Sequence, residues 1–487
     1  MKSDALMRAL ILLHRSVGVA FCLWFTMWFA SGIVMHFVPF PQFTEVARFA
    51  GLAPIDLANV KAGPAEAVAA SAIADATRVR LMQRSDGPVY LVPGSTRTAA
   101  LHATDLSDAA VHSRLLALTI ATDYAVNRKW DTAAAEIFDP AVYDQWTVPD
   151  DFDRYRPLYR VALNDGLGTD LYVSATTGEV VLETTHRERA WNYVGSIAHW
   201  IYPTVLRGHP TAWQRLLWWL SFLALIGASA GATTGMLRLG IDGKRFSSPY
   251  RGWRAGHHWI GLCCMPFVLS WIFSGWLSMD SGNLFATGRP TDSEAASIAT
   301  MPTWTAPRDA IQGLSAAARQ AEWFAFGGRI YRRERTSVDH QQLLLAGAED
   351  RAGGSDRAFL QQNEVDAAAG HLERPCDASF VLGPDDDYAI ASDMPNAPVF
   401  RVICGDDWFH VDASNGALLE RLDASRRAYR WLFRASHTLD FRFLTARPVL
   451  RTNLIVGLCG CGFIFSLTGV VIAWQRLLSC FRSLGRR

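Results

Sequence analysis

Four stretches of the chain are apolar over more than 20 residues each, and polar segments separate them. None of the four contains Asp, Glu, Lys or Arg. A helix needs roughly 20 residues to cross a hydrocarbon core of about 30 Å, so each stretch predicts a membrane-spanning helix. The first is too long for the apolar region of a signal peptide, which predicts an uncleaved span. The stretches are 16–44, 216–237, 255–279 and 452–475.

Basic residues gather at one end of all four spans. They lie before the first span, between the second and the third, and after the fourth, which places these three segments on the cytoplasmic side. Two polar segments of about 150 residues then lie outside, in a bacterial periplasm or its equivalent. The basic residues are Lys2, Arg8 and Arg15, then Arg238, Lys244, Arg245, Arg251 and Arg254, then Arg476, Arg482, Arg486 and Arg487.

Composition narrows the class of protein. Half of the residues are hydrophobic and 19% are charged, against about 25% charged in soluble domains. This composition argues against a purely cytosolic enzyme and against a disordered chain. The outer segments are acidic, with 14 basic and 20 acidic side chains in 39–190 and 13 and 23 in 280–426. They have no basic stripe, which argues against nucleic acid.

The chain also repeats itself, which predicts two parallel halves related by an axis along the membrane normal. The longest match runs without a gap at a constant offset in the numbering and pairs His199 with His437. In the spans, His14 matches His257, and a Ser-Gly pair follows each of the two at the same interval. The matched segments are 14–18 with 257–261, 173–181 with 411–419, and 189–239 with 427–477.

The predicted fold is a membrane protein with four transmembrane helices in two parallel repeats, each with an inserted periplasmic α+β domain. Cys376 and Cys404 are the two cysteines in a polar region, and they can form a disulfide if that region is extracytoplasmic. The predicted parts are 1–40 (N-terminal segment and first span), 41–190 (first domain), 191–240 (interfacial His segment and second span), 241–255 (cytoplasmic loop), 256–280 (third span), 281–428 (second domain), 429–477 (interfacial His segment and fourth span) and 478–487 (cytoplasmic tail).

Histidines at both membrane faces carry the candidate chemistry. Imidazole is costly in hydrocarbon and usually faces a bundle interior, and the repeat brings matched histidines to equal depth. Two such imidazoles suit axial ligation of a haem iron. The expected pairs are His14 with His257 on the cytoplasmic side and His199 with His437 on the outer side.

Two further histidines compete for these roles. His36 closes the first span on the outer side, where the third span has Met279. His258 lies beside His257, so either of them can belong to the inner pair. Which residues complete the two sites stays open at this point.

These motifs resemble the PepSY-associated transmembrane family. The resemblance is carried by the His-x-x-x-Gly starts of the first and third spans, by the Val-[Ser/Asp]-Ala-[Thr/Ser]-x-Gly hairpins at 173–178 and 411–416, and by Ala198-His199 and Ser436-His437. It covers nearly the whole chain and implies PepSY-like domains. Some relatives are inner-membrane ferrisiderophore reductases with two b-type haems, which implies His14, His257, His199 and His437 as ligands, with His36 and His258 as further candidates.

The resemblance implies an oxidoreductase that moves electrons to a ferric siderophore or similar acceptor in the periplasm. The chain has no fused flavin domain and no G-x-G-x-x-G after a strand, so a separate cytoplasmic flavoprotein or a quinol is the expected donor. One alternative is a haem-free PepSY protein that regulates or tethers periplasmic partners. Another is a transporter with a histidine proton relay.

Overall fold

The chain forms two compact units in the computed structural model, which describes residues 2–242, 245–280, 284–300, 304, 311–346, 357–389 and 395–484. The first, called here the helical unit, contains residues 1–40, 188–285 and 427–487. The second, the sheet unit, contains residues 41–187 and 286–426. The basic residues Lys244, Arg486 and Arg487 lie outside the described residues.

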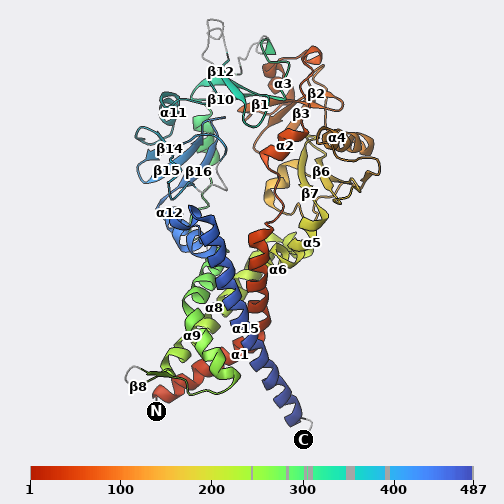
Figure 1. The fold of residues 1–487 in the computed structure, drawn as a ribbon. Helices are drawn as coiled ribbons and strands as arrows, with labels where there is room; N and C mark the ends of the chain where they lie inside the picture. Colours follow the sequence, from red (N-terminus) through yellow and green to blue (C-terminus); the bar gives the residue numbers. More distant parts are fainter. Residues whose placement is uncertain are drawn as a thin grey trace. The chain divides into compact units, whose positions relative to one another are not determined.

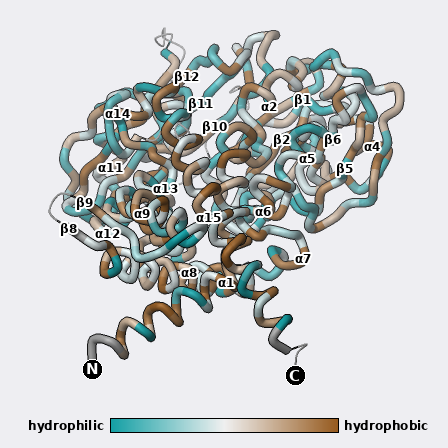
Figure 2. The backbone as a smooth tube through the Cα atoms, turned by 60° about the horizontal axis from the view of Figure 1, so that its bottom comes forward, coloured by the Kyte–Doolittle hydropathy of each residue, from teal (hydrophilic) through white to brown (hydrophobic). Residues whose placement is uncertain are grey.

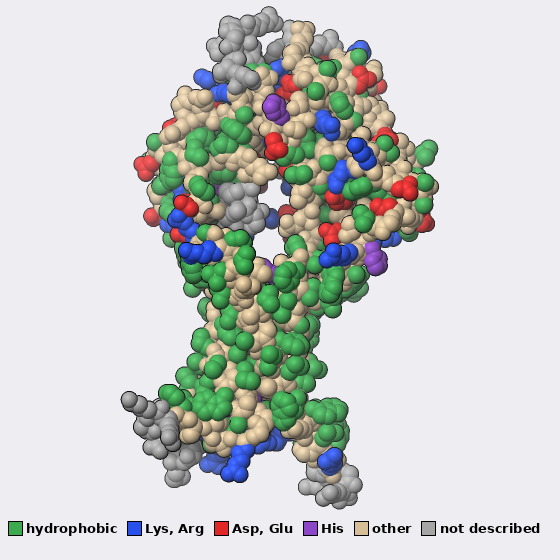
Figure 3. Space-filling view, viewed as in Figure 1, with side chains coloured by type: hydrophobic (Ala, Val, Ile, Leu, Met, Phe, Trp, Pro, Cys, Tyr) green, Lys and Arg blue, Asp and Glu red, His purple; other side chains and the backbone are tan. Residues whose placement is uncertain are grey.

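Four long helices build the helical unit, and all four are long and apolar enough to cross a membrane. Helix α1 packs on α8 and α15, and α9 packs on the same two helices (Figure 1). Hydrophobic side chains cover the outside of this bundle, and Lys and Arg gather at the end that holds the termini (Figure 3). The helices are α1 (Lys2–Phe37), α8 (Pro210–Leu237), α9 (Trp253–Leu277) and α15 (Pro448–Leu484).

Local sequence explains where these helices begin. Pro210 opens α8 and Pro448 opens α15; proline suits the first turn, where the backbone N–H has no partner within the helix. Gly252 precedes α9 with a φ of +58°, a conformation open to glycine. Both α8 and α15 therefore start several residues before the charge-free stretches that predicted them. Hydrophobic residues predominate along the spanning helices (Figure 2).

Short helices precede α8 and α15 and carry the outer histidines. Before α8 these are α5 (His186–Val194), α6 (Ser196–Trp200) and α7 (Thr204–Arg207). Before α15 they are α12 (Ala424–Tyr429), a π-helical turn (Arg430–Ala435), α13 (Ser436–Thr438) and α14 (Arg442–Thr445). A two-stranded hairpin, β8 (Gly240–Asp242) and β9 (Arg245–Ser247), connects α8 to α9.

A six-stranded antiparallel sheet forms the centre of the sheet unit, in the order β12-β11-β10-β1-β2-β3. The inserted segments were predicted as two separate domains, but β1 of the first pairs with β10 of the second, with Arg80 opposite Glu322. The two segments therefore share one sheet. Its strands are β1 (Arg78–Arg84), β2 (Gly87–Pro93), β3 (Thr98–His102), β10 (Gln320–Phe326), β11 (Arg329–Arg335) and β12 (Gln341–Leu345).

Two four-stranded sheets flank the central one and have the same strand order, β4-β5-β6-β7 and β13-β14-β15-β16. Each has a register shift, between Tyr172 and Val173 in one and between His410 and Val411 in the other. These positions correspond to one another in the sequence repeat. The strands are β4 (Glu136–Ile137), β5 (Leu158–Ala162), β6 (Asp170–Ser174), β7 (Val180–Thr184), β13 (Phe380–Val381), β14 (Val399–Cys404), β15 (Asp407–Asp412) and β16 (Leu418–Leu422).

Helices cover the apolar faces of these sheets. Helix α3 (Pro64–Ser71) lies on the central sheet, where Tyr90 and Trp323 are fully buried. Helix α4 (Arg114–Asn127) covers the first small sheet and α11 (Gln362–Ala369) packs on β14 of the second. Short helices α2 (Glu45–Gly51), α10 (Asp292–Ile298), Leu57–Asn59 and Asp150–Tyr155 complete the unit.

A disulfide joins Cys376 to Cys404, as the sequence allows. Cys404 is buried within the apolar core between α11 and the second small sheet. The bond closes a loop of 28 residues, and such a cross-link stabilises a fold by about 3 kcal/mol, mainly by restricting the unfolded chain.

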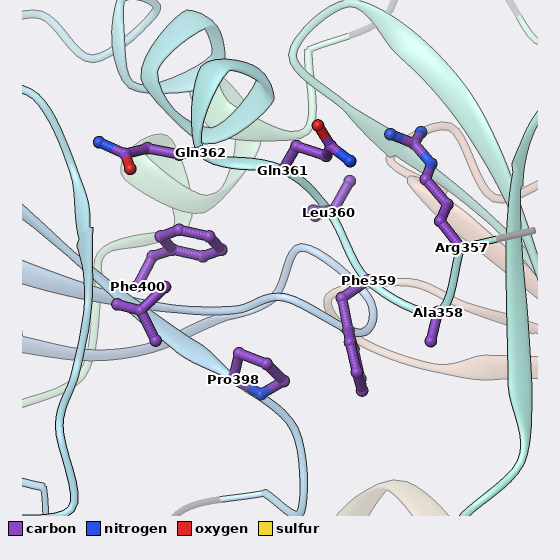
Figure 4. Close-up of a pocket in the computed structure, with 9 residues that line it drawn as sticks. Arg357, Ala358, Phe359, Leu360, Gln361, Gln362, Pro398 and Phe400 are labelled. Atoms are coloured by element: carbon purple, nitrogen blue, oxygen red, sulfur yellow. The ribbon is translucent and has the colours of Figure 1, made fainter. Parts of the chain in front are cut away.

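A surface cavity of about 450 Å³ lies beside this core (Figure 4). Apolar side chains line most of it, among them Phe359, Pro398 and Phe400. Arg357, the charged residue among the described residues that line it, is paired with Glu364 at 2.9 Å. The cavity therefore offers a ligand mainly apolar contacts.

Glu45 links the two halves of the sheet unit. It accepts hydrogen bonds from Arg48, its neighbour on α2, and from Arg335 on β11 at 2.8 Å. Burial alone raises the pKa of Glu45, but the two guanidinium groups outweigh burial and lower the pKa to about 2.

We predict that acid weakens the sheet unit partly through Glu45. A carboxyl with a lowered pKa stabilises the folded state above its ordinary pKa of 4.5, and this contribution is lost as the pH falls from 4.5 toward 2. The denaturant midpoint of the full-length protein should therefore drop less between about pH 5 and about pH 3 in Glu45→Gln than in the wild type. Equal drops in both proteins would contradict this role.

Candidate site: two pairs of histidines in the helical unit

The structure brings His14 and His257 together. His14 lies on α1 and His257 on α9, and their ring centroids are 6.2 Å apart with 35° between the ring planes. The packing of α8 and α15 between these two helices positions both rings. These are the residues that the sequence matched as the inner pair.

His199 and His437 form a second pair. They come from α6 and α13, the short helices before the spanning helices α8 and α15. Their ring centroids are 6.4 Å apart with 71° between the planes. The outer pair is thus also composed of the residues that the sequence matched.

Hydrogen bonds fix the inner rings through Nδ1. His14 Nδ1 lies 3.0 Å from the carbonyl oxygen of Gly227, which can only accept, so Nδ1 carries the proton. His257 Nδ1 lies 2.8 Å from Thr468 Oγ1. The Thr468 hydroxyl donates its single proton to the carbonyl of Phe465, so it accepts from His257.

The outer rings follow the same rule. His199 Nδ1 bonds Ser31 Oγ, and His437 Nδ1 bonds Ser274 Oγ, both at 3.0 Å. Each serine hydroxyl donates to a backbone carbonyl of its own helix and so accepts from the imidazole. All four rings therefore carry hydrogen on Nδ1 and a free lone pair on Nε2, the arrangement of metal-binding histidines whose other nitrogen is held by the protein.

The spacing of each pair suits one metal ion between two Nε2 atoms. A metal–imidazole bond is about 2 Å, and a ring nitrogen lies about 1.2 Å from the ring centroid. Linear coordination by two imidazoles therefore separates the centroids by about 6.4 Å, close to both observed distances. Among the described residues no three His, Cys, Asp or Glu side chains gather as a metal site, so these pairs are the ligand sets to consider.

The competing histidines have other partners. His258 donates from Nε2 to the carbonyl of Gly235 at 2.9 Å, and its Nδ1 meets Ser248 Oγ at 2.8 Å. Both nitrogens are thus occupied. His36 lies on α1 with its Nε2 3.0 Å from Thr452 Oγ1 on α15.

Glycines give the rings room. A Cβ atom at Gly231 would lie 2.4 Å from Cε1 and Nδ1 of His14. Gly469 is next to His257, Gly32 to His199 and Gly275 to His437, each with a hypothetical Cβ 3.4–3.9 Å from the ring. Every ring thus packs against a residue without a side chain.

An equivalent anchor holds each outer segment. The Trp213 indole donates to the carbonyls of Trp200 and Ile201 at 3.0 and 3.1 Å. At the matching position of the second half, Arg451 donates to the carbonyls of Thr438 and Leu439 at 2.7 and 3.0 Å.

The turn that follows each outer histidine is strained. Ile201 and Leu439 have φ values of +48° and +51°, a conformation that costs a residue with a side chain about 1 kcal/mol. The anchors offset this cost and hold the turn that aims each histidine.

The pairs lie at two levels of the bundle. Ser31 on α1 binds His199, and Ser274 on α9 binds His437, so both serines mark the outer level. Ser31 lies as many residues after His14 as Ser274 lies after His257. At about 1.5 Å of rise per helical residue, this interval places the two levels about 25 Å apart. An apolar cluster fills the bundle between them, including Phe29, Phe267 and Trp271.

Sequence reasoning identified the four rings but not their partners. Ser31 and Ser274 were visible as part of the repeated Ser-Gly pair, and their constant distance from His14 and His257 was the available signal. Thr468 and Gly227 had no comparable signal, because they lie on other helices and are not equivalent positions in the repeat.

The chain matches no protein-family model and no curated protein in the comparisons made.

We predict that the four paired histidines share the Nδ1–H tautomer in the metal-free protein. Nitrogen-15 NMR of histidine-labelled protein should show it for these four residues and the opposite tautomer for His258. Ser31→Ala removes the Ser31 acceptor and leaves the Trp28 carbonyl beside the His199 ring, so it should lower the population of this tautomer at His199 while His437 keeps it. Signals assigned by single His→Gln variants that show Nε2–H at the paired rings would contradict the assignment.

Proposed function

We propose that the protein carries electrons across a membrane through two b-type haems and reduces a ferric complex on the outer side. The observation that carries this proposal is the pair of neighbouring imidazoles at each of two levels, with centroids 6.2 and 6.4 Å apart and Nδ1 bonded to the protein. A proton relay would need ionisable groups at intermediate depth, where the cluster between the two levels is apolar.

The residues present suit a haem at each level. His14 and His257 would hold the inner group, and His199 and His437 the outer one. Bound haem iron supplies one-electron chemistry at a potential that its surroundings set. The chain orients the imidazoles through Ser31, Ser274, Thr468 and Gly227 and excludes water with the apolar cluster between the levels.

We further propose that the chain is a duplicated PepSY-like protein. The two small sheets support a repeat, because they have equal strand order and register shifts at matching positions. So do the matched anchors, Trp213 and Arg451. In this proposal each half contributes one imidazole to each level.

Two features support an inner-membrane location with the sheet unit in the periplasm. The basic residues at the ends of the spans favour cytoplasmic termini. The Cys376–Cys404 disulfide is typical of an oxidising compartment. Electrons would then enter from a cytoplasmic flavoprotein or a quinol, with Arg15 and Arg254 near the inner pair as candidate partners for anionic groups.

The test is the dithionite-reduced minus oxidised absorption spectrum of the full-length protein in detergent, with haem quantified per chain. We predict two b-type haems. His14→Ala or His257→Ala should remove one, and His199→Ala or His437→Ala the other, because a bis-imidazole site fails when one ligand is lost. His258→Gln is the matched control and should retain both. A colourless protein, expressed with ample haem, would overturn the proposal and favour a haem-free PepSY binding protein.

Gly231 gives a second prediction that leaves every histidine in place. Gly231→Ala puts a Cβ where the His14 ring lies, so the ring must move and the inner haem should be lost. Gly457→Ala is the control, since its Cβ meets no atom within 4 Å. The double variant Gly231→Ala/His199→Ala should be colourless. Retention of two haems by Gly231→Ala would contradict the role of His14.

A further inference from the structure

The two small sheets stand on the same face of the six-stranded sheet. A Cβ at Gly178, in the β6–β7 turn, would lie 2.4 Å from Arg84 of β1, and one at Gly416, in the β15–β16 turn, would lie 2.5 Å from Phe326 of β10. Side chains alternate along a strand, and Arg84 and Phe326 are each an even number of positions from the facing pair Arg80 and Glu322. The small sheets therefore form two walls around a floor made by β1 and β10, and the sheet unit is hollowed between them (Figure 3).

This floor has a surplus of arginine, although the sheet unit as a whole is acidic, with 26 basic and 41 acidic side chains. Its strands β1 and β11 and helix α2 contribute five guanidinium groups that are close to three carboxylates. We call this set the arginine floor. It consists of Arg48, Arg78, Arg80, Arg333 and Arg335 with Glu45, Glu179 and Glu322.

Two of the three carboxylates are shared between arginines, and the third, Glu179, pairs with Arg80. Glu322 accepts from Arg78 at 3.3 Å and from Arg333 at 2.6 Å, and Glu45 serves Arg48 and Arg335. Burial and the nearby charge of Arg333 lower the pKa of Arg335. At Arg80 burial also acts to lower the pKa, but the surrounding anionic groups, Glu179 first, outweigh burial and raise it.

Donors on the arginine floor also stay unused. Within the described part of the chain, Arg48 Nη1, Arg333 Nε and Arg335 Nε are buried without a hydrogen-bond partner. Arg78 and Arg80 remain accessible, with side chains 31% and 23% exposed. A solute in the hollow can therefore reach Arg78 and Arg80, which are paired with Glu322 and Glu179 and belong to a set in which five cations face three carboxylates.

We propose that the arginine floor binds an anionic metal chelate whose free carboxylates face Arg78 and Arg80. Guanidinium groups match the planar, bidentate geometry of carboxylates. An added anion would also reduce the electrostatic repulsion between the five guanidinium groups. This inference names the acceptor class of the proposed function and rests on it.

The experiment is calorimetric titration of the full-length protein with gallium(III) citrate, which cannot accept an electron and so reports binding alone. Arg78→Gln/Arg80→Gln should weaken binding at least about tenfold, since it removes both accessible charges. Arg114→Gln is the control, because Arg114 is an exposed arginine of the same unit paired with Asp139. Binding to the wild type should also weaken as salt is raised. Thermal melts establish that each variant is folded, and single Arg80→Gln replaces the double variant if that does not fold.

Two results would overturn the inference. Unchanged affinity in the arginine variants would exclude the arginine floor, and equal affinity for a neutral gallium trihydroxamate complex would exclude recognition by charge. Haem content of the same samples separates this inference from the proposed function. A coloured protein that binds no anionic chelate defeats the inference alone, and a colourless protein that binds it defeats the electron-transfer proposal.

Discussion

Every imidazole N–H placed inside an apolar bundle needs an acceptor, and the helical unit depends on how it meets this requirement. An unpaired polar group in such surroundings costs several kcal/mol. The chain meets the requirement on the same nitrogen four times, with two serines, one threonine and one backbone carbonyl. The use of Nδ1 leaves each Nε2 without this hydrogen bond, and the rings lie in two pairs with centroids 6.2 and 6.4 Å apart.

The sheet unit depends on a different constraint, the pairing of β1 with β10. These strands are far apart in the chain, with a spanning helix pair between them, and closing so long a loop is costly in entropy. Once closed, the sheet is continuous, and charged groups across the junction become neighbours, as Arg78 and Glu322 do. Glu45 and Arg335 add a second connection. Glu322 and Arg335 are the buried partners of these pairs, and leaving a buried charge without its counter-charge is costly.

The sequence predicted the spanning helices and the paired histidines because both leave local signals. Charge-free length identifies a span, and the constant offset of the repeat aligned His199 with His437. The shared sheet was not predicted, because the residue patterns of β1 and β10 indicate that each is a strand but not which strand it pairs with. The choice between His257 and His258 also needed the structure. Adjacent helical residues point about 100° apart, but only the positions of Gly235, Ser248 and Thr468 show which ring has a free nitrogen.

The proposed halves are most alike at the outer level and least alike at the inner one. Outside, a serine holds each imidazole. At the inner level, His257 bonds the Thr468 hydroxyl and stacks on Phe465, with ring centroids 4.7 Å apart. In the first half, Ala230 takes the place of Thr468 and Gly227 the place of Phe465. With no hydroxyl at Ala230, His14 bonds the Gly227 carbonyl instead.

The different acceptors of His14 and His257 affect the basicity of the two inner imidazoles. A carbonyl and a hydroxyl accept the imidazole proton with different strength, and acceptor strength tunes the basicity of a ligating imidazole and the potential of the metal that it holds. The inner level thus combines two unlike imidazoles and the outer level two like ones. In the proposed function, this divergence would give the two levels different potentials, while the potentials of the donor and the acceptor would set the net direction of electron transfer.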